Sequence, residues 1–170
     1  AKERKAKAVC VASTGNMAAS VSAYAAQAGL PCYVLVPEGT PIGKLAQTLS
    51  YGARVLQIRG TYDDCVRLVR EMARKYGYFL CGDYAWRREG QKSTSYEIVE
   101  QLGWRAPDIV ICPVGFGSNF AALYKGFAEF KKLGLIERVP RLIAVQAAGC
   151  SPITDAWERR KSVCVPVLKP

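Results

Sequence analysis

Short runs of β-branched and other apolar residues alternate with helix-like patterns from one end of the chain to the other. Such alternation predicts parallel β-sheets whose strands are joined by covering helices. The predicted strands are residues 8–12, 32–36, 54–58, 78–80, 109–112 and 142–145. Because the 170 residues are 50% hydrophobic and 22% charged, they are also sufficient for a globular α/β fold with a substantial core.

The segments between the strands carry helix signals. Asn16 is predicted to cap an Ala-rich helix that ends at Gly29, and Thr61 to begin a helix that ends at Gly77. The apolar stripe of the first helix is expected to be Val21, Tyr24, Ala25 and Ala28. That of the second is expected to be Cys65, Leu68, Val69, Met72, Ala73 and Tyr76.

The regular pattern breaks over residues 83–91, a polar and aromatic stretch without a clear period. A second series of strands and helices follows, with helices expected over residues 92–102 and 119–133. We therefore predict two lobes, residues 1–85 and residues 86–170.

Charge and residue counts exclude several classes of function. The net charge is +10, but the basic residues form small separate groups, so no nucleic-acid partner is expected. No apolar run approaches the ~20 residues of a membrane span, so no membrane partner is expected either. The absence of histidine excludes histidine-based triads and histidine-ligated zinc.

The seven cysteines are never closer than fourteen positions in the sequence. This spacing contains no CxxC-type pair, so no metal site is predicted. Several cysteines fall within strand-like runs, where they are expected to act as small buried hydrophobic residues. An odd number of buried thiols is typical of the reducing cytoplasm, which is the predicted location.

Two loops join the carboxyl end of a predicted strand to the start of a helix, where open α/β sheets bind ligands. In the first loop, Ser13, Thr14, Gly15 and Asn16 offer backbone N–H groups and side chains suited to a carboxylate and a ring oxygen. The second loop, residues 113–119, reads Pro-Val-Gly-Phe-Gly-Ser-Asn and suits a phosphate group. It is neither a P-loop nor a complete dinucleotide fingerprint. Taken alone, each loop is also compatible with an ordinary strand-to-helix connection without a ligand.

An ordered set of motifs nevertheless resembles the threonine synthases, within the fold-type II pyridoxal-phosphate enzymes. The motifs are Ala-Ser-Thr-Gly-Asn at residues 12–16, Glu-Gly-Gln-Lys-Ser at residues 89–93, the second loop, and Val-Gln-Ala-Ala-Gly at residues 145–149. The resemblance covers nearly the whole chain. It implies an α/β fold with three-layer parallel sheets and covering helices, like the tryptophan synthase β chain. Residues 1–85 would form the small mobile lobe, and residues 86–170 would form part of the large cofactor-binding lobe.

The resemblance also implies roles for individual residues. Asn16 would bond the 3-oxygen of the cofactor ring. The phosphate of pyridoxal 5'-phosphate would lie against Gly115, Phe116, Gly117, Ser118 and Asn119. The substrate would contact Ser13, Thr14, Gly15, Met17 and Arg87. Arg87 would meet the phosphate of O-phosphohomoserine, because a planar guanidinium suits bidentate pairing; alternatively, it is a solvated surface arginine beside Arg88.

The implied activity is that of an amino-acid biosynthetic lyase, which converts O-phosphohomoserine and water to threonine and phosphate in a homodimer. In the family the Schiff-base lysine lies upstream of the first loop, and no such lysine is found in this sequence. We therefore expect the 170 residues alone to contain no catalytic residue and to be inactive, with Lys92 serving the structure. As part of a larger lobe, they should expose apolar surface around Val110 and Val145.

Four departures from the family pattern keep other functions open. Met17 stands where threonine is common, Phe116 where asparagine is common and Ala148 where glutamate is usual, and residues 81–84 replace a polar Asn-Ser stretch. Hydroxyl groups that would line a substrate phosphate are thereby lost. A related β-replacement or elimination enzyme, for example one similar to cysteate synthase, therefore remains an alternative. A non-catalytic phosphate-binding module is another.

Overall fold

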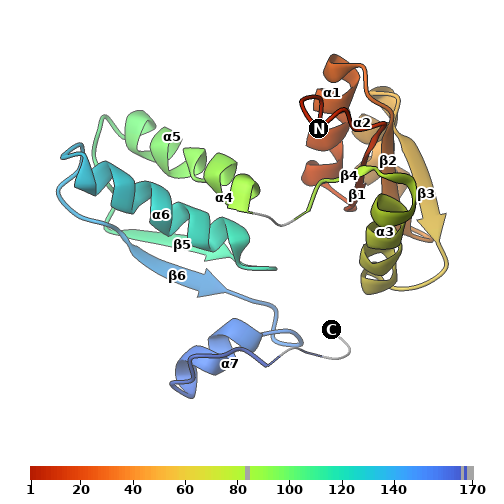
Figure 1. The fold of residues 1–170 in the computed structure, drawn as a ribbon. Helices are drawn as coiled ribbons and strands as arrows, with labels where there is room; N and C mark the ends of the chain where they lie inside the picture. Colours follow the sequence, from red (N-terminus) through yellow and green to blue (C-terminus); the bar gives the residue numbers. More distant parts are fainter. Residues whose placement is uncertain (83–84, 166, 168–170) are drawn as a thin grey trace. The chain divides into compact units, whose positions relative to one another are not determined.

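The computed structural model describes residues 1–82, 85–165 and 167, and the chain divides into two compact units (Figure 1). Unit 1 is Ala1–Gly82 and unit 2 is Asp83–Pro170. The division falls after Gly82, whereas the sequence pattern places the lobe boundary after residue 85. Each unit is described separately.

Unit 1 is built on a parallel sheet with the strand order β3-β2-β1-β4. The strands are β1 (Val9–Ala12), β2 (Cys32–Pro37), β3 (Arg54–Ile58) and β4 (Phe79–Leu80). Val9 pairs with Cys32 of β2 and with Phe79 of β4, so β1 lies inside the sheet. The four predicted strands of this unit and their parallel pairing are confirmed.

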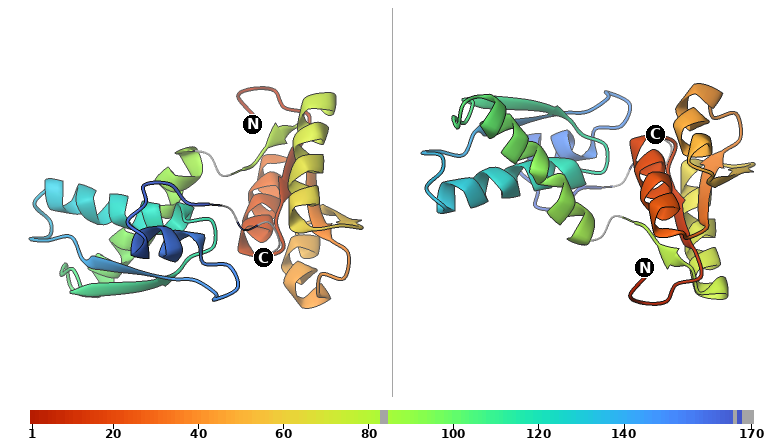
Figure 2. Two further views of the ribbon diagram at one scale, coloured as in Figure 1. Left: turned by 90° about the horizontal axis from the view of Figure 1, so that it is seen from below. Right: turned by 90° about the horizontal axis from the view of Figure 1, so that it is seen from above.

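Helices cover both faces of this sheet (Figures 1 and 2). Helices α1 (Asn16–Ala28) and α2 (Ile42–Ser50) pack on the face that carries Val9 and Val11. Helix α3 (Tyr62–Tyr76) packs on the face that carries Cys10 and Ala12. Because successive strand residues point to opposite faces, β1 contributes to both cores. Unit 1 is therefore a three-layer α/β structure, as predicted.

Two details of the predicted helix α1 are wrong. Its N-cap is Gly15, and Asn16 is the first helical residue, so the Asn16 side chain does not cap the helix. Tyr24 is 76% exposed, whereas the buried residues of the helix are Ala18, Ala19, Ser22 and Ala25. Small side chains allow the helix to approach the sheet closely, and the Ser22 hydroxyl donates to the Ala18 carbonyl at 2.7 Å, which makes its burial possible.

Unit 2 contains the parallel strands β5 (Ile109–Pro113) and β6 (Arg141–Val145). Helices α5 (Ser93–Gln101) and α6 (Ser118–Lys132) pack on one face around Val99, Leu123 and Phe127. The unit also contains the short helices α4 (Ala85–Gln91) and α7 (Pro152–Glu158). Strands β5 and β6 and helices α5 and α6 are confirmed within one or two residues.

Helix α4 contradicts the prediction of an irregular stretch over residues 83–91. Asp83 and Tyr84 of that stretch lie outside the described residues, but Ala85–Gln91 is helical. None of the seven residues of α4 is buried, so the helix lacks the apolar stripe on which the sequence prediction depends.

The side of the β5–β6 pair that does not face α5 and α6 is apolar. Ile111 is 67% exposed and Val145 is 49% exposed, whereas Val110 packs against the core. The expected apolar exposure is thus correct for Val145 and wrong for Val110, because alternate residues of β5 face opposite sides. Within the described parts of the chain, none of the helices combines the length and the apolar character that crossing a membrane requires.

Candidate functional site

The first candidate loop follows β1 in unit 1. The Ser13 backbone N–H donates to the Leu35 carbonyl at 3.3 Å, and the Tyr62 hydroxyl donates to the Ala12 carbonyl at 3.0 Å. These bonds hold the loop's beginning against β2 and α3. The Gly15 N–H donates to the Ser13 hydroxyl oxygen at 3.4 Å, which makes a compact turn before α1.

Helix α1 begins at the end of this loop. Its first carbonyl acceptor is Gly15, which receives the N–H groups of Ala18 and Ala19. Asn16 is exposed, whereas Met17 is half-buried and packs against the apolar core of α1, α2 and the sheet. Asn16 is therefore available to a ligand beside the helix N-terminus, and Met17 anchors the first helical turn.

The second candidate loop, residues 113–119, follows β5 in unit 2 and is called the glycine loop from here on. Gly117 has φ of +81°, in the left-handed region that favours glycine, and it is the N-cap of α6. Its carbonyl accepts the first backbone hydrogen bond of the helix, from Ala121 at 2.9 Å. A helix leaves the N–H groups of its first turn without backbone partners inside the helix, and these attract anions.

The glycine loop fits the phosphate of pyridoxal 5'-phosphate. The loop contains no acidic residue that would repel a dianion. A Cβ atom at Gly115 would meet no heavy atom within 4 Å, so the backbone there is open to approach. The Asn119 side chain is hydrogen-bonded to the Cys112 thiol, which leaves its backbone N–H as the group suited to a phosphate.

Arg87 lies on α4 and is half-buried, whereas its neighbour Arg88 is exposed. A half-buried arginine packs its aliphatic stem against its neighbours and keeps the charged guanidinium toward the surface. Of the two predicted roles, the half-burial favours the one in which Arg87 meets a ligand.

Four charged side chains and a tyrosine connect α4, α5 and α6. Lys92 Nζ lies 2.7 Å from Glu89 Oε2 and 2.9 Å from Glu129 Oε2. Lys125 Nζ contacts Glu89 Oε1 and lies 3.5 Å from Glu129 Oε1. The Tyr96 hydroxyl donates to Glu129 Oε2. This group is called the ion cluster below, and it attaches the helix that carries Arg87 to the helix that follows the glycine loop.

The ion cluster shifts the pKa values of its members. Hydrogen bonds from Lys125 and Lys92 lower the pKa of Glu89 to about 2, from its ordinary value of 4.5. Hydrogen bonds from Tyr96 and Lys92 lower the pKa of Glu129. Hydrogen bonds to Glu89 and Glu129 raise the pKa of Lys92. At neutral pH the carboxylates are therefore ionised and the Lys92 amine is protonated.

The sequence analysis missed the ion cluster. The only signal within one helix is the i, i+4 spacing of Lys125 and Glu129 in the predicted helix over residues 119–133. Contacts from α4 and α5 to α6 depend on how the helices pack, which the spacing does not contain.

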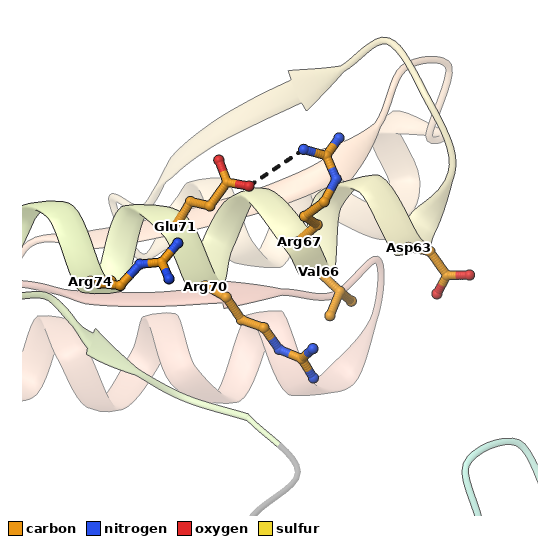
Figure 3. A pocket seen from close by; sticks show the side chains of 6 residues that line it. All are labelled: Asp63, Val66, Arg67, Arg70, Glu71 and Arg74. Carbon is orange, nitrogen blue, oxygen red and sulfur yellow. Dashed lines mark hydrogen bonds and ion pairs between the residues drawn. The ribbon is translucent and has the colours of Figure 1, made fainter.

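A surface hollow of about 520 Å³ lies along α3 in unit 1 and is a further site that the sequence analysis did not predict (Figure 3). Its lining residues are Asp63, Val66, Arg67, Arg70, Glu71 and Arg74. Arg67 pairs with Glu71 at 3.4 Å and with Asp64 at 3.2 Å, and Figure 3 shows Arg70 extending away from the Arg67–Glu71 pair. Because Arg67 is neutralised by two carboxylates, the hollow is less cationic than its arginines suggest.

The thiols of unit 1 are unreactive by environment. Burial raises the pKa of Cys10 to about 12 and that of Cys81 to about 11. Cys10, Cys32, Cys65 and Cys112 are buried, as expected for small hydrophobic residues in strands and helices. No group of three or more Cys, Asp or Glu side chains suited to a metal ion occurs in the parts of the chain that the structure describes.

Comparison with known proteins gives consistent relatives. The family model described as pyridoxal-phosphate dependent enzyme matches residues 1–169. The chain is 44% identical over 161 residues to threonine synthase from Methanocaldococcus jannaschii, a match that covers 94% of this chain and 40% of that protein. It is 46% identical over 150 residues to threonine synthase from Mycobacterium tuberculosis H37Rv, covering 86% and 41%. The chain thus spans about two fifths of the length of these curated relatives.

Solved structures of similar fold come from several enzymes. Maize serine racemase superposes with a TM-score of 0.80 at 20% identity, over 99% of this chain and 50% of that one. The T.th. threonine deaminase superposes with a TM-score of 0.79 at 25% identity, over 97% and 52%. The likeness to the racemase concerns the fold alone, and both are fold-type II enzymes, which confirms the predicted fold class.

Proposed function

Because this chain belongs to the pyridoxal-phosphate-dependent enzyme family, with pyridoxal 5'-phosphate as its cofactor, we propose that it is part of a threonine-synthase-like lyase. The proposed reaction converts O-phosphohomoserine and water to threonine and phosphate. The observation that carries the proposal is the 44–46% identity to threonine synthases over most of the chain, against 20–25% for the structural neighbours with other activities.

Bound pyridoxal phosphate supplies an electron sink for bond cleavage next to an amino group. In the proposal, the glycine loop of unit 2 binds the cofactor phosphate through the backbone of Gly115, Gly117 and their neighbours. The Asn16 amide donates to the 3-oxygen of the ring. Ser13, Thr14 and Gly15 hold the substrate carboxylate at the start of α1, where the helix dipole favours an anion.

Arg87 is proposed to bind the phosphate of the substrate. Its guanidinium remains charged at all working pH values and can form two parallel hydrogen bonds to phosphate oxygens. The ion cluster holds α4 through Glu89, two residues after Arg87, and thereby limits where the Arg87 side chain can reach.

Lys92 is proposed to serve the fold and not the chemistry. A lysine nucleophile requires a neutral amine. The Lys92 side chain is 20% exposed, its amine is bound by two carboxylates and its pKa is raised, so the neutral form is disfavoured. Unit 1 is proposed to be the mobile lobe, and unit 2 to be the part that carries the phosphate site.

One observation favours a second candidate, a related enzyme acting on another β- or γ-activated amino acid. Met17 directly follows Asn16 and packs into the apolar core, so the first turn of α1 offers a thioether where a hydroxyl would bind a phosphorylated substrate. This substitution does not affect the proposed cofactor contacts.

The test uses the protein in its full natural length. Visible absorbance that is lost on borohydride reduction is expected, together with phosphate release from O-phosphohomoserine and formation of threonine. Phosphate release from O-phosphoserine in place of O-phosphohomoserine would support the second candidate. A protein that binds inorganic phosphate but gives no chromophore with pyridoxal phosphate would be a phosphate-binding module, and both enzyme proposals would be rejected.

A further inference from the structure

The Gln146 side chain connects three backbone groups next to the glycine loop. It directly follows β6, and its Nε2 donates to the Val114 carbonyl at 3.3 Å. Its Oε1 accepts the backbone N–H groups of Ile153 and Thr154, in the first turn of α7, at 2.9 and 3.1 Å. One amide group thus joins the start of the glycine loop to the start of α7.

The first of these bonds orients the loop's beginning. Val114 is buried, and its own N–H donates to the Val145 carbonyl at 2.8 Å. The Val114 carbonyl and the Gly115 N–H belong to the same planar trans peptide group, in which they point in opposite directions. Because Gln146 holds the carbonyl, it also sets the direction of the Gly115 N–H.

The other two bonds act on the loop's end. They hold Ile153, whose Cδ1 lies 3.3 Å from the position that a Cβ atom at Gly117 would occupy. Gly117 is the N-cap of α6 and has a positive φ, so its conformation decides where the N–H groups of the first turn of α6 point. Gln146 therefore acts on both glycines of the loop, directly at Gly115 and through Ile153 at Gly117.

We propose that Gln146 is a positioning residue that holds the glycine loop in its phosphate-binding conformation without touching the phosphate. This inference rests on the proposed function only in that the loop binds the cofactor phosphate. A loop that is ordered before the ligand arrives does not lose conformational entropy on binding, so preorganisation raises affinity. Without Gln146, the Gly115 peptide and the start of α7 would each have to be ordered by the ligand.

The experiment separates phosphate binding from general stability. Equilibrium dialysis of the full-length protein measures the affinities of pyridoxal phosphate, of pyridoxal, which lacks the phosphate, and of inorganic phosphate. Gln146→Met removes all three hydrogen bonds at similar size. We expect it to weaken pyridoxal phosphate and inorganic phosphate about tenfold, the equivalent of one or two hydrogen bonds, and to leave pyridoxal within about twofold.

Two further variants divide the effect. Gln146→Glu retains an acceptor for the N–H groups of α7 but places a carboxylate oxygen against the Val114 carbonyl, so it should also lose phosphate affinity. Ile153→Val removes only the methyl group that lies against Gly117 and should cause a smaller loss of the same selective kind. Gln101→Met, at the exposed end of α5 in the same unit, is the control and should change no affinity.

The outcomes distinguish the two levels of the argument. If the unmodified protein binds pyridoxal phosphate no better than pyridoxal, the phosphate role of the loop is rejected, and the inference with it. If it prefers pyridoxal phosphate but the Gln146 variants weaken both compounds equally, or neither, Gln146 has a structural role only. Should Gln146→Met fail to fold, the selective loss expected for Gln146→Glu and Ile153→Val still decides the question.

Discussion

Lys92 Nζ lies 2.7 Å from Glu89 Oε2, and this ion pair joins α4 to the N-cap position of α5. The same amine reaches Glu129 on α6, so one side chain connects three helices. The carboxylates in this arrangement remain ionised to unusually low pH, and the stability of unit 2 should reflect it.

The first prediction concerns the pH dependence of stability. The pKa of Glu89 is lowered to about 2 in the folded state, below its ordinary value of 4.5. A lowered pKa stabilises the folded state at and above pH 4.5, and this contribution is lost as the pH falls toward 2. Glu89→Gln should therefore lower the midpoint of thermal unfolding at neutral pH, and the difference from the unmodified protein should shrink below pH 4.5. A difference that is independent of pH would contradict this.

The second prediction compares two helical glycines. A Cβ atom at Gly126 of α6 would lie 2.6 Å from the Lys92 carbonyl oxygen and 2.6 Å from Ser95 Oγ, so Gly126→Ala forces α5 and α6 apart. We expect the free energy of unfolding to fall by about 1–3 kcal/mol, as for other overpacked cores. Gly43 of α2 is exposed and meets no atom within 4 Å, so Gly43→Ala should raise it by up to about 1 kcal/mol. Denaturant titration measures both, and equal effects would contradict the close approach at Gly126.

The third prediction concerns two neighbouring arginines. Arg87→Ala should raise the KM for O-phosphohomoserine about tenfold or more, because a hydrogen-bonded partner of the substrate phosphate is lost. Arg88→Ala, at an exposed position of the same helix, should change KM little. Steady-state phosphate release from the full-length protein measures both values. Equal effects of the two substitutions would assign Arg87 to the solvated surface.

The fourth prediction concerns thiol reactivity. Cys164 is exposed, whereas Cys10 is buried and burial raises its pKa to about 12. Since the thiolate is the reactive form, iodoacetamide at mildly alkaline pH should modify Cys164 rapidly. Cys10 should react only after the protein is unfolded in denaturant. Peptide mass spectrometry at successive times identifies the modified residue, and early modification of Cys10 would show that the sheet of unit 1 opens locally.

Patterns along the sequence predicted the strands well and the α4 segment poorly. Strands such as Arg54–Ile58 are short apolar runs bounded by turn residues, so a local pattern is enough to locate them. Helix α4 buries no residue and therefore has no apolar period to detect. The N-cap of α1 was misplaced by one residue because both Gly15 and Asn16 are common at helix starts.

The candidate loops were also predictable, because a strand followed by glycine and a helix places backbone N–H groups at a sheet edge. The supports of those loops were not predictable in this way. Gln146 acts on Val114, 32 positions earlier, and Lys92 acts on Glu129, 37 positions later. Such contacts arise from tertiary packing, and an isolated glutamine or lysine in the sequence carries no sign of them.

The strand order of unit 1 has a consequence for the route by which this unit folds. Strands β1, β2 and β3 are neighbours in both sequence and space, so their pairing closes only short segments of chain. Strand β4 pairs with β1 across the whole intervening sequence, and the entropy of closing so long a loop delays that step. We therefore expect the first three strands to assemble while the chain is still emerging from the ribosome, with β4 added last at the open side of β1.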